Sequence, residues 1–289
     1  MLIEFMGYYQ ERDRQITNYR MFRLGGTGLS FRGPSPKTSD SGAYFTCLGA
    51  AQTFGCFCDR PYPTLLESGL DLPVLNLGYG GAGPAFFLKH SALIDYINRG
   101  RFAIVQVMSG RSESNSLFET GGLEFLKWRS DGRQMGSEPA YQELLETRDR
   151  DFVRMVVAET RRNWVTNYQL LLTEIRVPKI LFWFSERGPD YHETFDNIYC
   201  LFGKFPHLIN RDAIAKIKPF CDDYIECISD RGMPQLLIDR FTGDPTPLNL
   251  AYQRPDLGDK TSFYNNYYCA PEMQRDAAKS LISACKKYV

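Results

Sequence analysis

Short apolar runs alternate along this chain with longer amphipathic segments, and this alternation constrains the fold more than any other feature of the sequence. Runs that are short and continuously apolar are typical of parallel strands buried on both faces, with helices as the connections between them. The predicted strands are 43–48, 73–77, 103–108, 179–184 and 224–228. The predicted helices are 84–98, a long stretch within 137–175, 210–220 and 271–286. The pattern therefore predicts a three-layer α/β fold with a mainly parallel sheet and helices on both faces.

The chain has the length of one large α/β domain. Its 289 residues can bury a single core without division into separate domains. Residues 1–42 are rich in Gly, Ser and Pro and show no sustained period, so we predict an irregular lead-in packed on one domain that spans 43–289. Residues 229–265 contain many Pro, Gly, Asp and Asn residues, which predicts a long loop or partial lid before the last helix.

The charge balance and the lengths of the apolar runs exclude several classes of partner. The 34 basic and 34 acidic residues cancel, which leaves no strong positive field for nucleic acid. No apolar run approaches the roughly 20 residues of a membrane span, and the first residues lack the pattern of a signal peptide. Several of the eight cysteines lie within apolar segments, where a reduced thiol acts as a small hydrophobe. We therefore expect a cytoplasmic protein without a membrane span.

Glycine-rich turns follow the first two predicted strands. The first strand continues into residues 49–55, and the second continues into 76–84, with glycines at 78, 80, 81 and 83. The carboxyl ends of parallel strands meet at one edge of a sheet, where open α/β folds place their ligands. The sequence therefore predicts a site at this edge. The alternative interpretation is that the glycines only allow close packing of strand against helix.

These two turns resemble the first two sequence blocks of the SGNH (GDSL-type) hydrolases. Residues 49–55 match the first block, Gly-Asp-Ser-x-Thr-x-Gly, one for one, but Ala50 and Ala51 replace its Asp and its nucleophilic Ser. The resemblance implies a flavodoxin-like arrangement of about five strands. A bacterial family of unknown function with the same altered first block is also similar.

The same resemblance implies ligand-binding positions. Asn76 and Gly81 match the residues that form part of the oxyanion hole, and Ala51 and Gln52 lie at the position of the missing nucleophile. Alanine has no group that can attack a carbonyl, so a serine-esterase mechanism through position 51 is excluded. Thr53 is a candidate substitute. Cys56 and Cys58 are further candidates, although both also fit a buried helical start.

A polar segment, residues 109–116, follows the third predicted strand at the same edge. The third SGNH block, Gly-x-Asn-Asp, belongs here, but its asparagine position falls on Arg111 or Ser112, and Asn115 can supply the amide only through a shifted loop. Arg111 is a candidate to bind a phosphate, sulfate or carboxylate group. The alternative is that Arg111 pairs with an internal acid such as Glu113 or Glu186.

Three histidines limit the choice of a general base. His192 follows the fourth predicted strand close to Asp190, and nearby negative charge favours a base poised near neutral pH, although a solvated loop histidine fits the same pattern. His207 fits a packing or capping role, and His90 a structural one. In the fourth SGNH motif, Asp-x-x-His before the last helix, Gln274 stands at the position of the histidine. Glutamine cannot accept a proton near neutral pH.

Three functional hypotheses follow. The first is an SGNH-like enzyme with an altered catalytic set that acts on an ester- or sugar-containing substrate. The second is a non-catalytic SGNH-like module that binds a carbohydrate, a nucleotide or a partner protein at this edge. The third is a sulfo- or acyltransferase with a nucleotide donor as its cofactor, although the sequence has no Gly-x-x-x-x-Gly-Lys loop. No metal site is expected, because the cysteines and histidines lack the paired spacing of zinc ligands.

Overall fold

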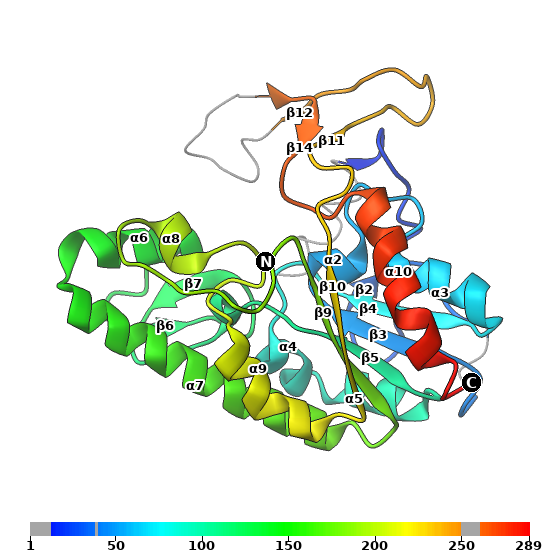
Figure 1. Cartoon of the computed structure of the whole chain (residues 1–289), viewed down its shortest axis with the longest axis horizontal. Coiled ribbons are helices and arrows are strands. Elements are labelled where there is room, and N and C mark those ends of the chain that lie inside the picture. Colours follow the sequence, from blue (N-terminus) through cyan, green and yellow to red (C-terminus); the bar gives the residue numbers. More distant parts are fainter. Residues whose placement is uncertain (1–12, 38–39, 250–260) are drawn as a thin grey trace.

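A five-stranded parallel sheet forms the centre of the computed structural model, which describes residues 13–37, 40–249 and 261–289. The strand order is β10-β9-β5-β3-β4, the flavodoxin-like order that the sequence resemblance implied (Figure 1). The five strands are β3 (Phe45–Gly49), β4 (Val74–Gly78), β5 (Ala103–Gln106), β9 (Lys179–Ser185) and β10 (Asp223–Ile228). Each lies within two residues of its predicted bounds, so the fold class is confirmed.

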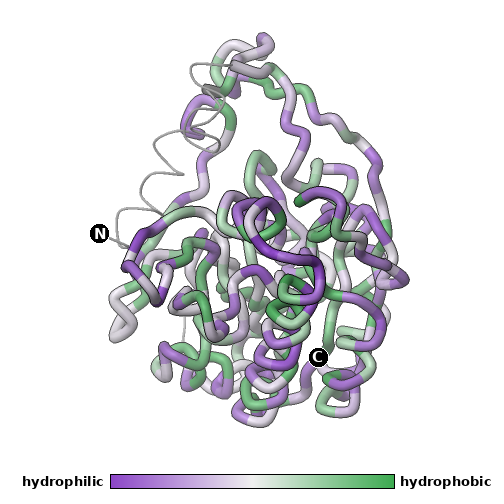
Figure 2. The backbone as a smooth tube through the Cα atoms, turned by 90° about the vertical axis from the view of Figure 1, so that its left-hand side faces the viewer, coloured by the Kyte–Doolittle hydropathy of each residue, from purple (hydrophilic) through white to green (hydrophobic). Residues whose placement is uncertain are grey.

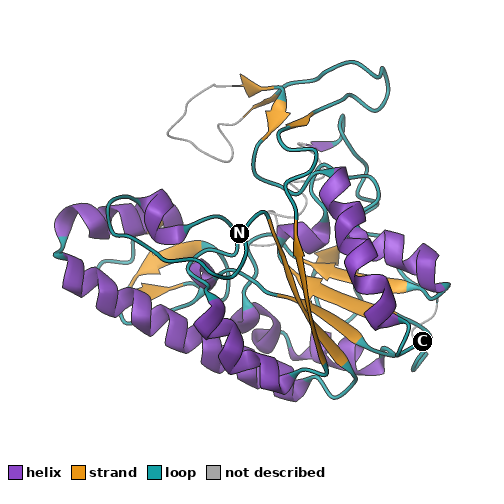
Figure 3. Ribbon diagram, viewed as in Figure 1, coloured by secondary structure: helices purple, strands orange, loops and turns teal. Residues whose placement is uncertain are grey.

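Helices cover both faces of this sheet (Figure 3). They are α2 (Ala51–Phe54), α3 (Tyr62–Leu70), α4 (Pro84–Lys89), α5 (Ser91–Arg99), α6 (Ser137–Thr147), α7 (Arg150–Glu174), α8 (Ile198–Phe202), α9 (Arg211–Ile217) and α10 (Pro271–Cys285). Two 3₁₀ turns, Gly110–Ser112 and Lys218–Phe220, complete the helical elements of the described residues. In Figure 2 the helices change repeatedly between hydrophilic and hydrophobic residues along their length, as amphipathic helices do.

Alternate side chains of each strand enter separate hydrophobic cores. In β9, Phe182 and Phe184 pack in a core with α3 and α10, whereas Leu181 and Trp183 pack in a core with α4, α5, α7 and α9. A strand with both faces covered must be apolar at every position. This burial explains why the sequence shows continuous apolar runs instead of alternation.

Two predicted helices are each divided into two. The segment 84–98 is interrupted at His90, which ends α4 and begins α5. The segment 137–175 is interrupted before Asp149, whose side chain caps α7 by accepting from Phe152 N. The Asn210 side chain caps α9 by accepting from Ala213 N, and Gly136 takes the N-cap position of α6.

A second, antiparallel sheet was not predicted. Its strands are β6 (Phe118–Glu119), β7 (Phe125–Trp128) and β8 (Gln134–Gly136). This sheet packs with α6, α8 and the first half of α7 around a third hydrophobic core, which forms the left-hand lobe of Figure 1. Only Leu126 and Trp128 of β7 are buried, in the alternation typical of a half-exposed strand.

Two further segments of the described chain lie outside the two sheets. The described part of the lead-in carries a small hairpin of β1 (Phe22–Arg23) and β2 (Ser30–Phe31), and its Tyr19 and Phe31 join the main core. Residues 229–249 and 261–268, which we call the arm, project from the body in Figure 3. The arm's strands are β11 (Gln235–Leu236), β12 (Leu248–Asn249), β13 (Thr261–Ser262) and β14 (Tyr264–Asn265). The rest of the predicted loop or lid, 250–260, lies outside the described residues, and the domain boundary at residue 43 stays a prediction.

Candidate functional site

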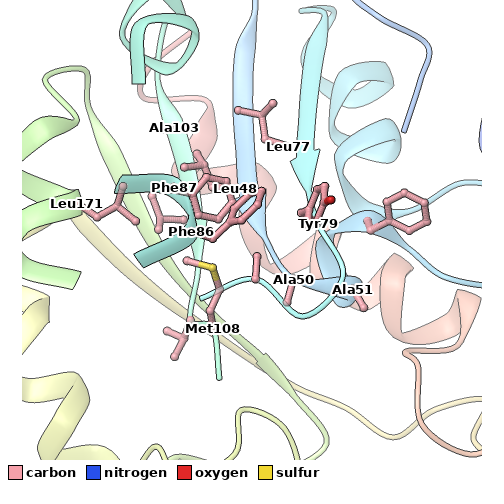
Figure 4. Close-up of a cluster of buried hydrophobic side chains, with 14 of the residues drawn as sticks. Leu48, Ala50, Ala51, Leu77, Tyr79, Phe86, Phe87, Ala103, Met108 and Leu171 are labelled. Atoms are coloured by element: carbon pink, nitrogen blue, oxygen red, sulfur yellow. The ribbon is translucent and has the colours of Figure 1, made fainter. Parts of the chain in front are cut away.

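The turn after β3 carries no reactive side chain. Helix α2 begins at Ala51, where the resemblance placed a nucleophile, and Ala51 is only 6% exposed. Ala50 and Ala51 belong to the main hydrophobic core together with Phe57 and Tyr79, and Figure 4 shows them at the start of α2 near Tyr79. This part of the predicted crevice is therefore apolar and closely packed.

The polar residues around α2 are used to hold the fold together. The fully buried Thr53 donates from Oγ1 to Gln106 Oε1 at 2.6 Å. Asn76 Nδ2 donates to Thr53 O at 3.0 Å, while its Oδ1 accepts from Gly78 N at 2.9 Å. A Cβ added to Gly78 would lie 2.2 Å from Phe54 N, so only glycine allows α2 to lie this close to β4. These contacts give Thr53 and Asn76 structural partners, and Gly78 fits the alternative interpretation that the glycines allow close packing of strand against helix.

Gln274 and the nearby thiols also have structural surroundings. Gln274 is fully buried on α10, where it accepts from Tyr62 N at 2.8 Å and donates to Gln52 O at 3.0 Å. Burial raises the pKa of Cys58 to about 11 in spite of the neighbouring Arg32, so this thiol stays protonated at neutral pH. Cys56 is equally buried.

Arg111 lies among carboxylates, but they are not the predicted ones. Its guanidinium pairs with Glu124 and, at 2.9 Å, with Glu138, and not with Glu113 or Glu186. The chain folds back through the unpredicted small sheet and α6, which brings these two acids to the edge. The charge of Arg111 is thus compensated twice, which leaves little attraction for an added anion.

The loops after β4 and β5 meet at Gly81. Ser112 Oγ donates to Gly81 O at 2.7 Å, and a Cβ on Gly81, whose φ is +74°, would lie 2.9 Å from Glu124 Cγ. Asn115 is buried away from this contact, because its Nδ2 donates to Thr160 Oγ1 and its Oδ1 accepts from Phe118 N, both at 2.9 Å. The structure therefore brings Gly81, Arg111 and Ser112 together and directs the Asn115 amide elsewhere.

A serine–histidine pair that the sequence analysis did not select lies beside Arg111. Ser109 Oγ and His207 Nδ1 are 3.2 Å apart, and Gly110 N donates to His207 O at 2.9 Å, so both backbone and side chain fix the pair. Ser109 is 4% exposed and His207 is 5% exposed. The two residues are 98 positions apart in the chain, so no local spacing could have revealed them.

The electrostatics keep this histidine neutral. Burial lowers the pKa of His207 well below 6.5, and the positive charges of Arg111 and Arg187 lower it further. A neutral imidazole with its proton on Nε2 can accept the Ser109 hydroxyl proton at Nδ1. The arrangement has the two groups needed for nucleophilic catalysis by a hydroxyl.

Tyr267, from the arm, lies over this pair. Its ring is nearly parallel to that of His207, at 10° with 6.3 Å between ring centroids, and its hydroxyl accepts from Arg111 Nη2 at 3.0 Å. Tyr267 itself is 39% exposed. The arm therefore places an aromatic side chain next to the buried histidine.

The predicted base and its acid lie apart from these groups. His192 and Asp190 are exposed on the loop after β9, and Asp190 accepts from Arg211 Nη2 at 2.6 Å. Within residues 13–37, 40–249 and 261–289, no hydrogen bond joins either residue to Thr53. The same described ranges hold no group of three or more His, Cys, Asp or Glu placed to bind a metal ion, and no helix in them is long and apolar enough to cross a membrane.

Comparison with known proteins gives a family and several distant structural likenesses. The model of a family described as a domain of unknown function (DUF6473) matches residues 6–121 and 142–247. No curated protein matches the sequence.

Three solved structures illustrate the likenesses. A protein from Slackia heliotrinireducens, provisionally assigned as an SGNH hydrolase, is 12% identical with a TM-score of 0.41, over 85% of this chain and 100% of that one. A family two carbohydrate esterase from Clostridium thermocellum, in complex with cellohexaose, is 9% identical with a TM-score of 0.41, over 89% and 67%. A lipase from a goat rumen metagenome is 11% identical with a TM-score of 0.37, over 82% and 96%. Likenesses at this level do not identify an activity.

Proposed function

This chain belongs to the family described as a domain of unknown function (DUF6473), and we propose that it is an ester-directed enzyme whose nucleophile is Ser109 and whose general base is His207. The observation that carries the proposal is the 3.2 Å contact between Ser109 Oγ and His207 Nδ1 at the carboxyl edge of the sheet. This edge is where open α/β folds place their ligands. Under this proposal the nucleophile is Ser109, whereas the SGNH resemblance places it at position 51, which is alanine in this chain.

The chemistry follows from a neutral His207. As Ser109 Oγ bonds to the carbonyl carbon of an ester, His207 Nδ1 takes the hydroxyl proton and then returns it to the departing alkoxide as the C–O bond breaks. Water next attacks the acyl group on Ser109, and His207 takes and returns a proton in the same way. The products are an alcohol and a carboxylic acid, and the enzyme is regenerated.

The surrounding charges favour an uncharged substrate. Arg111 carries one positive charge, whereas its partners Glu124 and Glu138 carry two negative charges. The positive charge of Arg187 also acts on His207, so the charges around the site are close to balance and an anionic donor such as a nucleotide meets no uncompensated positive charge there. A neutral ester, such as an acylated sugar, needs no such charge. This balance weighs against a nucleotide-dependent transferase.

A non-catalytic binding module is the second candidate, and two observations favour it. Ala50 and Ala51 are packed into the core at the positions where the resemblance places an Asp and a nucleophilic Ser. The oxygen and the nitrogen of the Gln274 side chain both form hydrogen bonds with backbone groups. Under this alternative, an ester or sugar would bind at the edge near Gly81 without a covalent step.

Substitution of Ser109 distinguishes these candidates. We expect Ser109→Ala to lower the hydrolysis of aryl acetates by at least about 100-fold and to abolish covalent labelling by a fluorophosphonate, located by mass spectrometry. Ser116→Ala is the matched control, because Ser116 lies on the same loop and contacts Glu159. Thermal melts of both variants test whether either one is unfolded at the assay temperature. Unchanged turnover in Ser109→Ala would remove the enzyme proposal, whereas ligand binding without any turnover would favour the binding module.

Introducing the serine of the SGNH first block at position 51 provides an independent test. We expect Ala51→Ser to add no hydrolysis and no label at residue 51, because Gln274 cannot act as a base. A gain that depends on position 51 would place the site there and not at Ser109.

A further inference from the structure

A small cavity beside the lead-in is lined by three arginines, Arg20, Arg32 and Arg60, and by one acid, Asp59. Its volume is about 190 Å³. The other lining residues are Asn18, Gly33, Pro34 and Thr64. None of these residues belongs to the group around Ser109 and His207. The ionised side chains give the cavity an excess of positive charge, in contrast to the surroundings of Arg111.

Arg32 is the fixed part of this cavity and is only 2% exposed. Its Nη1 donates to Phe54 O at 3.1 Å and to Gly55 O at 2.6 Å. Its Nη2 donates to Cys58 O at 2.6 Å and to Asp59 O at 2.8 Å. All four acceptors are neutral carbonyls, so they satisfy the donors without compensating the charge.

In the part of the chain that the structure describes, the charge of Arg32 is offset only in part, by Asp59 and by the rings of Tyr19 and Phe54, whose centroids lie 5.0 and 5.9 Å from the guanidinium carbon. No salt bridge to it is formed there, and its Nε–H makes no hydrogen bond there. A buried cation with no ion-pair partner is costly, and burial lowers the pKa of Arg32. An anion beside Arg32 would relieve that cost.

The two exposed arginines complete a set of donors around the same space. Among the described residues, neither Arg20 nor Arg60 forms a salt bridge, and Arg60 makes a single side-chain hydrogen bond, to Ser68 Oγ at 3.1 Å. Thr64, in the first turn of α3, also lines the cavity and adds a hydroxyl group. Guanidinium groups bind the oxygens of phosphate in pairs, which suits a cavity with several arginines.

We propose that this cavity binds a phosphate group, with Arg32 as the fixed contact and Arg20 and Arg60 as the side chains that close on it. The cavity is separate from the proposed ester site, so the two proposals can fail independently. Arg32 holds the carbonyls of the loop that joins α2 to α3, so bound phosphate would also restrain residues 54–59.

Isothermal titration with inorganic phosphate, and separately with glycerol 1-phosphate, tests the proposal at constant ionic strength. We expect binding to the unmodified protein and an affinity at least about fivefold weaker in Arg20→Gln and in Arg60→Gln, which is about 1 kcal/mol per variant. Arg23→Gln is the control, because Arg23 is an exposed arginine of the same lead-in that does not line the cavity. Tighter binding of one probe identifies whether free phosphate or a phosphate monoester is preferred.

Two results would overturn the proposal. One is that neither probe gives more heat than sodium chloride at matched ionic strength. The other is binding that survives the double variant Arg20→Gln/Arg60→Gln, which would place the anion elsewhere. Both exposed positions can be changed without disturbing the core, so unfolding does not confuse the comparison.

Discussion

The side-chain oxygen of Gln274 accepts a hydrogen bond of 2.8 Å from the backbone N–H of Tyr62, 212 residues earlier in the chain. The same amide donates to Gln52 O, so one buried side chain satisfies two backbone groups at the ends of α2 and α3. Gln274 thereby acts as a structural link at the position where the SGNH resemblance expects a histidine.

Replacing this amide should destabilise the protein. We expect Gln274→Leu to lower the free energy of unfolding by about 2–4 kcal/mol, because it leaves a buried N–H and a buried C=O without partners. Urea unfolding followed by circular dichroism measures the change. Ser283→Ala, on an exposed face of α10, should unfold like the unmodified protein. A loss below about 0.5 kcal/mol would show that water replaces the amide.

Acid should destabilise the protein through His207. Its pKa is lowered on folding, so the unfolded chain binds more protons than the folded chain below about pH 6.5. The contribution of neutral His207 to stability is therefore complete above that pH and is lost progressively as the pH falls below it. We expect His207→Gln to unfold with a weaker dependence on pH between pH 7.5 and 5.5, and the exposed His192→Gln to keep the original slope. Equal slopes in all three proteins would contradict a buried neutral imidazole.

The contribution of Glu113 to stability should depend on pH in the opposite sense to that of His207. Burial raises its pKa from 4.5 to about 7, although Asn167 Nδ2 donates to its carboxylate at 2.6 Å. The folded protein then binds the extra proton, so stability falls as the pH rises from 4.5 through 7. We expect Glu113→Gln to be more stable than the unmodified protein at pH 8, by on the order of 2–3 kcal/mol. Chemical unfolding at pH 5 and pH 8 measures this, with the exposed Glu119→Gln as control. A variant that is less stable at pH 8 would mean that the charged carboxylate is needed there.

Tyr267 should limit access to Ser109. Its ring stacks on that of His207 and its hydroxyl accepts a hydrogen bond from Arg111, so we expect it to hinder the approach of a substrate to the buried pair. We expect Tyr267→Ala to raise kcat/KM for small aryl acetates several-fold. Tyr267→Phe keeps the ring and loses only the hydroxyl, so its rate should change little. A large loss of rate in Tyr267→Ala would instead give the ring a role in binding substrate.

The central sheet could be predicted because its strands are buried on both faces. Burial on both sides forces a continuous apolar run, as in β9, and such runs are visible in the sequence. The small sheet was missed because its strands have two to four residues and only β7 alternates clearly. The break at His90 was missed because no side-chain cap or proline marks it.

The sequence analysis predicted the edge of the sheet at which the candidate site lies, but not the serine–histidine pair within it. Glycine-rich turns and a polar loop identified the carboxyl edge, and Gly81, Arg111 and Ser112 do meet there. The partners of Arg111 and the pairing of Ser109 with His207 depend on how distant segments fold back, which no local spacing records. The roles proposed for His192, Asp190 and Thr53 remain predictions, and among the described residues no hydrogen bond joins His192 or Asp190 to Thr53.

The Gln274 link has a consequence for synthesis on the ribosome. The chain emerges from its N-terminus at about 5–20 residues per second. The hydrogen-bond partner of Tyr62 N is therefore synthesised 212 residues after Tyr62, and the same side chain is the partner of Gln52 O, 222 residues after Gln52. A nascent chain halted before α10 lacks the side chain that satisfies these two backbone groups, so the contacts of α2 and α3 with α10 can form only after residue 274 has been made.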